Sequence, residues 1–311
     1  MKRIVLVLLI LSQVLMLSGC TGFVIGMTKP VLREMIAKPA FGVFLQEEDL
    51  GLAKDAIGGQ IKLVEILLKN MKGDKELLLL LCQGYASYGQ LLEVKRNALK
   101  LQGTSAASKA AKVLTTRIRS FALRGRSFCF QILEQKYKDF GKKALKGDKS
   151  FSELLASIKD PADAKALFWL GYAWGYALIN GLTEPDLIAQ IPQLKAVMQK
   201  VIALDEDFFH GAAHLFLATL YAQPKMYGGD LKKSKTHFDK AFTFSKKKLL
   251  LIQLYQAQYY ANQKDDTKMC KSLLEGIQKA PKDLSKDLML VNQLAKAQAE
   301  LGLKYIDDFC P

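Results

Sequence analysis

Two histidines, four residues apart, come closest to a catalytic arrangement in this sequence. His210 and His214 fall in a segment with helical periodicity, and at this spacing two imidazoles can face one metal ion, with Asp207 as a third ligand. No glutamate follows His210 as in the metalloprotease motif, and His214 falls where a helix would face the core. We therefore expect packing roles and predict neither a bound metal nor a cofactor. A metal-dependent hydrolase is the weakest alternative.

Gly228-Gly229-Asp230 could in principle bind an anion through backbone N–H groups at the start of a helix. Asp230 is itself negative and would repel a phosphate, whereas a tight turn and a helix N-cap account for the same three residues. We therefore assign them a structural role. The sequence also has no Gly-x-Ser-x-Gly elbow, phosphate-binding loop or Cys-x-x-Cys motif, so no enzymatic activity is predicted.

The start of the chain predicts export and attachment to lipid. Lys2 and Arg3 precede an apolar run from Ile4 to Leu17, which is too short for a membrane span and is typical of a secretory signal peptide. Cys20 follows Leu-Ser-Gly, as in a bacterial lipobox, where the cysteine thiol is acylated and becomes the mature N-terminus. An ordinary secretory signal with an incidental cysteine is the alternative. We predict a signal peptide over residues 1–19 and a membrane anchor at Cys20.

Composition and charge narrow the possible partners. Removing 19 of the 311 residues leaves 292, enough for one large core, and no later segment is apolar for long enough to span a bilayer. The formal net charge of +15 falls to +13 without Lys2 and Arg3. In an exported protein this charge favours an acidic lipid surface or an acidic partner. Nucleic acid is not expected, because the chain is exported and has no basic motif interleaved with aromatic residues.

Besides Cys20 the chain has four cysteines, an even number in a compartment that can oxidise them. Cys82 and Cys129 fall in apolar helical segments, where we expect inert buried thiols. The spacing of the four, which include Cys270, has neither a zinc nor a redox signature. Whether Cys310 has a disulfide partner is left open.

Helical periodicity runs through the rest of the chain, without the alternation typical of strands. Gly, Pro or capping residues interrupt it at residues 71–74, 103–105, 147–148, 160–161, 181–185 and 281. The expected fold is all-α, a TPR-like helical repeat superhelix of about ten antiparallel helices. The predicted organisation is a lipidated linker over residues 20–46, which is rich in Gly and Pro, and one all-helical domain over residues 47–311.

Three degenerate units fit the tetratricopeptide pattern, in which small residues let paired helices nest closely. Their first helices carry Gly171 with Trp174, Ala218 with Tyr221, and Ala257 with Tyr260. Their second helices carry, in turn, Ala196 and Ala203; Ser234, Phe238 and Ala241; and Cys270, Leu274 and Ile277. The units are 47 and 39 residues apart, longer than the usual repeat of about 34, so the loops must have grown.

Short motifs follow one another along nearly the whole mature chain. They are Gly84-Tyr85 with Tyr88, Leu123-Arg124-Gly125-Arg126, the segment from Leu167 to Gly175, Leu204-Asp205-Glu206, Gly211-Ala212-Ala213-His214, Gly228-Gly229-Asp230, His237-Phe238 with Ala241, and Asn292, Ala295 and Ala299. In this order they resemble the TatT family, TPR-like lipoproteins associated with TRAP transporters. The family carries a tyrosine just before the Arg-Gly pair, where this chain has Ala122 and Leu123, so a ligand contact made there does not carry over.

The resemblance implies a homo-oligomer, expected to be a trimer. It also implies docking to a periplasmic solute-binding protein and transfer of a hydrophobic or organic-acid ligand to a membrane permease, without catalysis. The alternative from another class is an envelope scaffold lipoprotein that binds protein segments in outer-membrane or cell-wall assembly. Thr21 only weakly disfavours retention in the inner membrane, so the choice of membrane stays open.

The inner helices of such a superhelix line a concave groove, which is where a ligand is expected. Gly171 marks the side of its helix that packs on the partner helix. Helical spacing from this glycine places Phe168, Tyr172 and Tyr176 on the groove side and Trp174 on the side of the partner helix. The same spacing from Ala218 places Leu215 and Thr219 on the groove side. Arg124 lies among phenylalanines, where it could meet a ligand carboxylate or form a structural salt bridge. An aromatic stripe at helical spacing can equally be core. The predicted ligand groove comprises Arg124, Phe168, Tyr172, Tyr176, Leu215 and Thr219.

Overall fold

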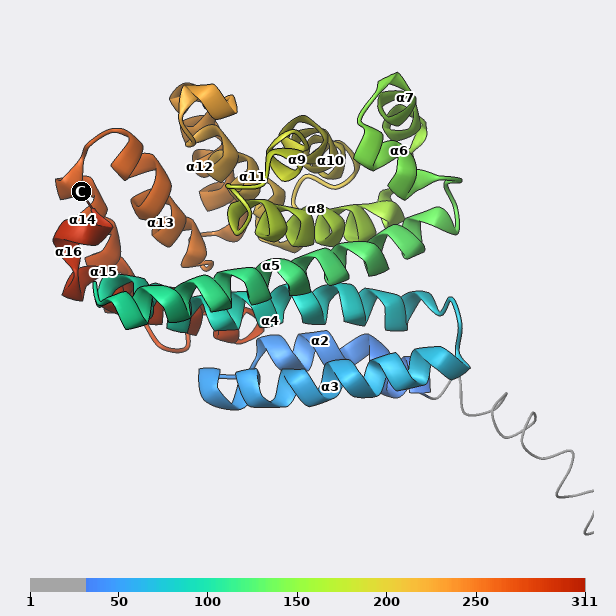
Figure 1. Ribbon diagram of the computed structural model, residues 1–311, viewed down its shortest axis with the longest axis horizontal. Coiled ribbons are helices and arrows are strands. Elements are labelled where there is room, and N and C mark those ends of the chain that lie inside the picture. Colours follow the sequence, from blue (N-terminus) through green and yellow to red (C-terminus); the bar gives the residue numbers. More distant parts are fainter. Residues whose placement is uncertain (1–31, 311) are drawn as a thin grey trace, which may run out of the picture.

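The computed structural model describes residues 32–310, and this part of the chain is helical with no strand. The all-α prediction is confirmed. Figure 1 shows the helices stacked largely in chain order, from α2 and α3 through α4, α5 and α8 to α10–α12, with α13–α16 closing one end. The predicted signal peptide and Cys20 lie outside the described residues. Within residues 32–310 no helix combines the length and apolarity needed to cross a membrane.

The helices differ widely in length, and short ones join the long ones. Their bounds are η1 (π-helical, Leu32–Ala37), α2 (Lys38–Leu45), α3 (Leu50–Asn70), α4 (Lys75–Leu101), α5 (Ser105–Glu134), α6 (Phe140–Lys146), α7 (Lys149–Ser157), η2 (Pro161–Asp163), α8 (Ala164–Ile179), α9 (Pro185–Ile188), α10 (Ile191–Leu204), α11 (Phe208–Tyr221), η3 (Lys225–Tyr227), α12 (Leu231–Ser245), α13 (Leu251–Tyr255), η4 (π-helical, Gln256–Ala261), α14 (Thr267–Lys279), η5 (Lys286–Leu288), α15 (Met289–Lys304) and α16 (Ile306–Phe309).

Side-chain caps set the helix starts at the breaks that the sequence predicts. Asp74 caps α4 by accepting from the N–H groups of Glu76 and Leu77, and Thr104 caps α5 by accepting from that of Ala107. Asp148 and Asp160 do the same for α7 and η2. Each cap satisfies N–H groups that have no partner inside the helix, so the predicted breaks are confirmed.

The long helices α4 and α5 pack antiparallel and are joined by a disulfide between Cys82 and Cys129, whose Cα atoms are 5.6 Å apart. The expectation of two inert free thiols is wrong. A Cβ on Gly125 would lie 3.0 Å from the carbonyl oxygen of Cys82, so this glycine lets the two helices approach closely at the bridge. Helical periodicity shows that a cysteine is buried but not which residue lies opposite. A second disulfide joins Cys270 to Cys310 and supplies the partner of Cys310.

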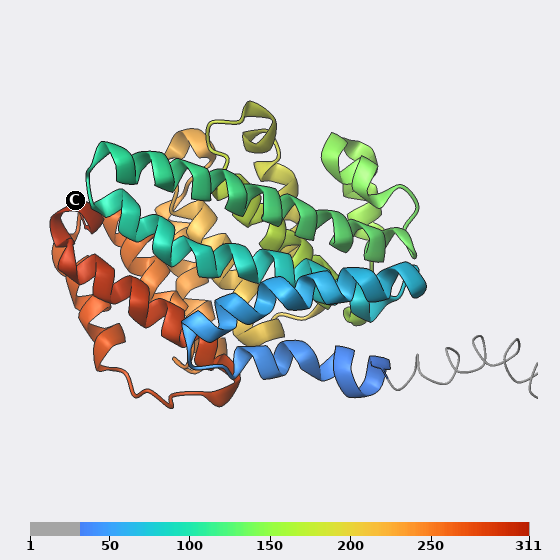
Figure 2. The same ribbon diagram turned by 60° about the horizontal axis from the view of Figure 1, so that its bottom comes forward.

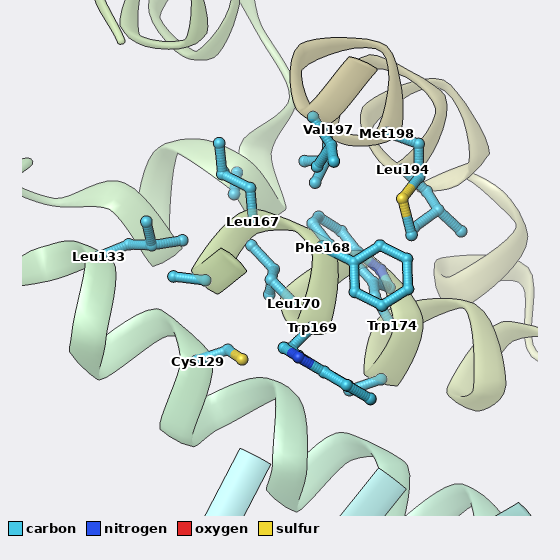
Figure 3. Close-up of a cluster of buried hydrophobic side chains, with 14 of the residues drawn as sticks. Cys129, Leu133, Leu167, Phe168, Trp169, Leu170, Trp174, Leu194, Val197 and Met198 are labelled. Carbon is cyan, nitrogen blue, oxygen red and sulfur yellow. The ribbon is translucent and has the colours of Figure 1, made fainter. Parts of the chain in front are cut away.

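The three repeat units appear as the helix pairs α8 with α10, α11 with α12, and α13–η4 with α14. Figure 3 shows the packing around the first unit, where side chains of α8 lie between Cys129 and Leu133 on one side and Leu194, Val197 and Met198 on the other. One position differs from the sequence pattern. Ala203 is exposed, and α10 instead buries four larger side chains against its neighbours, namely Leu194, Val197, Met198 and Val201.

The folded body begins before Glu47, contrary to the predicted linker over residues 20–46. The residues of η1 and α2 are helical and pack on the domain, with Ala37 and Leu45 buried. Figure 2 shows α2 beside α3 and close to α15. Pro39 suggests a break in the sequence, but the backbone stays helical there and changes only from the π-helical η1 to the α-helical α2.

Candidate ligand-binding cavity

A cavity lies where the inner helices of the repeat units face α4. Its walls come from α4, α8, α11, α13 and η4, and α2 and α15 complete it. The cavity is small, with a volume of about 80 Å³ for the centre of a water-sized molecule. The cavity is therefore narrow, and a slender apolar molecule fits it better than a bulky one.

One end of the cavity is aromatic. Phe41 of α2 meets Trp169 of α8 edge to face, with ring centroids 4.8 Å apart. Phe168 is buried and packs against Phe209 of α11 at 5.8 Å. These rings come from three helices, so the apolar end depends on the correct packing of α2 against the repeat units. Such a surface would bind an apolar body through the hydrophobic effect and dispersion.

The other end is polar and is organised around Glu93 of α4. Tyr176 donates a hydrogen bond of 3.0 Å from its hydroxyl to Oε2 of Glu93 and lies 3.4 Å from the hydroxyl of Tyr255. Tyr172 donates to Oε1 of Gln90 at 2.7 Å. The hydroxyls of Tyr172 and Tyr176 are thus held by neighbours on α4, which is the arrangement expected where a ligand head group must be oriented.

An ion pair supports Glu93 from behind. Its Oε1 accepts from Arg96, one turn further along α4, and both side chains are largely buried. Arg96 also donates to Oδ1 of Asn180 at 2.9 Å, and Asn180 in turn donates to the carbonyl of Tyr176. Removing either charge would leave the other buried without a partner, which is strongly destabilising.

The tyrosines of the polar end remain protonated at neutral pH. Burial raises the pKa of Tyr172, Tyr176, Tyr255 and Tyr259 above the usual value, and the negative charge of Glu93 raises the pKa of each further. Each hydroxyl group therefore keeps its single proton, which Tyr172 donates to Gln90 and Tyr176 donates to Glu93. The same effect shows that the charge of Glu93 is felt throughout this end of the cavity.

Five of the six predicted groove residues line this cavity: Phe168, Tyr172, Tyr176, Leu215 and Thr219. The sixth, Arg124, does not. Its side chain is exposed, and its guanidinium lies 5.4 Å from the centroid of the Tyr85 ring. Both side chains lie on the side of α4 and α5 that faces away from the cavity. The expectation that Arg124 faces the ligand is wrong, because α5 turns this residue away from the repeat units.

Sequence reasoning missed several lining residues. Glu93 and Gln90 lie on α4, outside the repeat units. No repeat motif on α4 indicates which of its residues face the groove. In the third unit the count used for the first two, starting from Ala257, points to Leu254 and Gln258, whereas the cavity is lined by Tyr255 and Tyr259. Tyr259 lies in the π-helical turn η4, whereas Tyr255 is the last residue of α13 before it.

Two predicted structural positions of the first unit, Gly171 and Trp174, lie outside the cavity. A Cβ on Gly171 would come within 2.6 Å of Cε of Met198, so this glycine allows α8 and α10 to nest. Trp174 is fully buried, packs edge to face on Phe130 of α5 and donates to Oε1 of Gln190 at 2.8 Å, where α10 begins.

The turn Gly228-Gly229-Asp230 joins η3 to α12. Gly228 has a φ of 74°, and Asp230 caps α12 by accepting from the N–H groups of Lys232 and Lys233. A Cβ on Gly229 would lie 1.6 Å from the carbonyl oxygen of Gln223, so no other residue fits there without movement of the backbone.

The histidines do not form the metal site that their spacing allows. Phe209, His210 and Gly211 have left-handed backbone angles, so His210 and His214 do not share one regular helical face. His214 is buried, with Nδ1 2.8 Å from Nδ1 of His237 and Nε2 3.2 Å from Oε1 of Glu206. Among residues 32–310 there is no group of three or more potential ligands arranged for a metal ion.

Comparison with known proteins gives one family. The family model described as TRAP transporter T-component matches residues 46–309, which include every wall of the cavity except α2. No curated protein matches the chain.

Proposed function

Because the chain belongs to the TRAP transporter T-component family, an accessory component of TRAP transport, we propose that it binds the transported solute and docks the other components at the membrane. The observation that carries this proposal is the cavity between the repeat helices and α4. It combines an aromatic end with a few fixed polar groups, as small-molecule sites generally do. The solute is expected to have a hydrophobic body, and a periplasmic solute-binding protein is the expected partner.

We also propose that the protein is lipid-anchored in the bacterial cell envelope and faces the periplasm. The lipobox-like sequence ending at Cys20 supports the anchor. The two disulfides support an oxidising compartment, since such bridges are rare where thiols are kept reduced.

A homo-oligomer, expected to be a trimer, is proposed to form through an apolar face on η1, α2 and α3. Six large apolar side chains there are more than half exposed: Met35, Ile36, Val43, Leu52, Leu63 and Ile66. On α3 the exposed Leu52, Gly59, Leu63 and Ile66 follow the spacing of a coiled-coil seam. We name this surface the α2–α3 face.

Charge favours a second copy as the occupant of the α2–α3 face. Residues 33–76 contain seven basic and eight acidic residues, whereas the whole chain has a net charge of +15. Two strongly basic copies repel each other, and this nearly neutral segment is where that repulsion is weakest.

Native mass spectrometry of the chain beginning at Thr21, alone and mixed with the solute-binding protein encoded beside it, tests the proposal. We expect a defined oligomer that binds this partner and carries a small molecule. Ala212, which lines the cavity, gives the key variant: Ala212→Phe should lose the small molecule but keep the partner. Ala203→Phe, on the exposed side of α10, is the control and should keep both. A monomer that ignores the partner would contradict the transport role and favour an envelope scaffold.

A further inference from the structure

The walls of the cavity carry no positive charge. Among the described residues no lysine, arginine or histidine lines it, and the one charged side chain that does is Glu93. A site built for a free carboxylate usually offers arginine, lysine or several backbone N–H groups, and the cationic candidate from the sequence, Arg124, lies elsewhere. The chemistry of the walls therefore argues against an organic acid as the ligand of this chain.

Arg96 cannot serve as the missing cation. It does not line the cavity, and its guanidinium is held by Glu93 and by Oδ1 of Asn180. The pair presents the carboxylate of Glu93 to the cavity and holds the guanidinium behind it. The field at the polar end is therefore that of a dipole whose negative end faces the ligand.

The tyrosines add to the same preference. The hydroxyl of Tyr255 contacts that of Tyr176, and the ring of Tyr259 lies 5.8 Å from that of Tyr255. Aromatic faces attract cations, and a carboxylate that already accepts from Tyr176 and Arg96 has lone pairs left for one more donor. The charge of Glu93, which raises the pKa of all four tyrosines, would likewise raise the pKa of a ligand carboxyl group.

We propose that the cavity takes an amphiphile with an apolar body and a hydrogen-bond-donating head group seated at Glu93, prefers an amine to an alcohol, and discriminates against a free carboxylate. The body lies along Phe41, Phe168 and Trp169, and the head lies among the tyrosines. This inference rests on the proposed function, because it takes the cavity as the solute site. It replaces the organic acids expected from the family resemblance with a basic or neutral class.

A matched series of ligands tests the preference. Decylamine, 1-decanol and decanoate share one alkyl chain and differ in the head group. They are titrated at neutral pH into the chain beginning at Thr21, with the fluorescence of Trp169 in the cavity wall as the signal. We expect decylamine to bind tightest and decanoate weakest, by about tenfold, which corresponds to about 1.4 kcal/mol.

The variant that assigns the preference to Glu93 removes both charges together. Glu93→Gln combined with Arg96→Met avoids a buried unpaired guanidinium and should bring decylamine and decanoate within a factor of about three. Glu300→Gln, an exposed acid on α15, is the matched control and should keep the full discrimination. Thermal unfolding of each variant shows that it is folded before the titration.

The outcomes separate this inference from the proposed function. If decanoate binds tightest, or if the double variant keeps the preference for the amine, the inference is wrong and the cavity still stands as a solute site. If none of the three ligands binds, and Ala212→Phe retains the same bound molecule as the original chain, both the inference and the proposed site are wrong.

Discussion

The disulfide between α4 and α5 allows a quantitative prediction for the stability of the domain. Cys82 and Cys129 are 47 residues apart, and in the chain-entropy treatment a loop of this length lowers the entropy of the unfolded state by an amount worth about 4 kcal/mol at 25 °C. Replacing both residues with alanine should lower the free energy of unfolding by about this value. Alanine suits both sites because each side chain is fully buried and a serine hydroxyl would lack a partner.

Urea unfolding monitored by circular dichroism measures the effect, with the slope of the transition checked for constancy. The second bridge is an internal comparison: Cys270 and Cys310 are 40 residues apart, so their paired alanine variant should lose nearly the same free energy. Reduced, unmodified protein should resemble the variant that lacks both bridges. A loss below about 1 kcal/mol for the Cys82 and Cys129 pair would show that the closed loop does not restrict the unfolded chain as argued.

Three further outcomes are expected. Gly229→Ala should cost about 1–3 kcal/mol in urea unfolding, because its Cβ would clash with the carbonyl oxygen of Gln223; no loss would mean that this turn can open. Burial lowers the pKa of His237 from its usual 6.5 to about 4. The unfolded state therefore takes up the proton first, and the free energy of unfolding should fall as the pH drops from about 6.5 towards 4. His237→Phe should flatten this dependence, and an unchanged pH profile would contradict the prediction. Leu63→Glu on the α2–α3 face should yield a folded monomer by analytical ultracentrifugation. Val113→Glu, at an apolar site on α5 that is even more exposed, should leave the oligomer intact.

The helices could be predicted because their ends depend on local chemistry. Asp74 and Thr104 accept from N–H groups two or three residues away, so the sequence alone places these starts. The groove side of α8 and α11 followed from one small residue in each, since in a repeat a close helix contact fixes the orientation of the whole helix. The same count does not extend to the third unit, where Tyr255 and Tyr259 line the cavity.

The features that could not be predicted from the sequence depend on contacts between distant segments. Predicting the disulfide between Cys82 and Cys129 requires knowing which residues of α4 lie opposite which residues of α5, and helical periodicity does not determine this. Glu93 looks in the sequence like one charged residue among many on a long helix. Only the packing of α8 and α13 against α4 surrounds it with tyrosines and makes it the charged group of the cavity.

The short helix α2 links the two surfaces to which we assign roles. Phe41 and Leu45 on its inner side line the cavity, and Val43 on its outer side belongs to the α2–α3 face. A ligand that shifts α2 on binding must therefore change the affinity between copies, and oligomer formation must change ligand affinity by the same factor. A ligand that leaves α2 in place would produce no such coupling. Measuring ligand affinity in the Leu63→Glu monomer and in the oligomer distinguishes the two cases, because a ratio other than one shows that ligand binding and association are coupled.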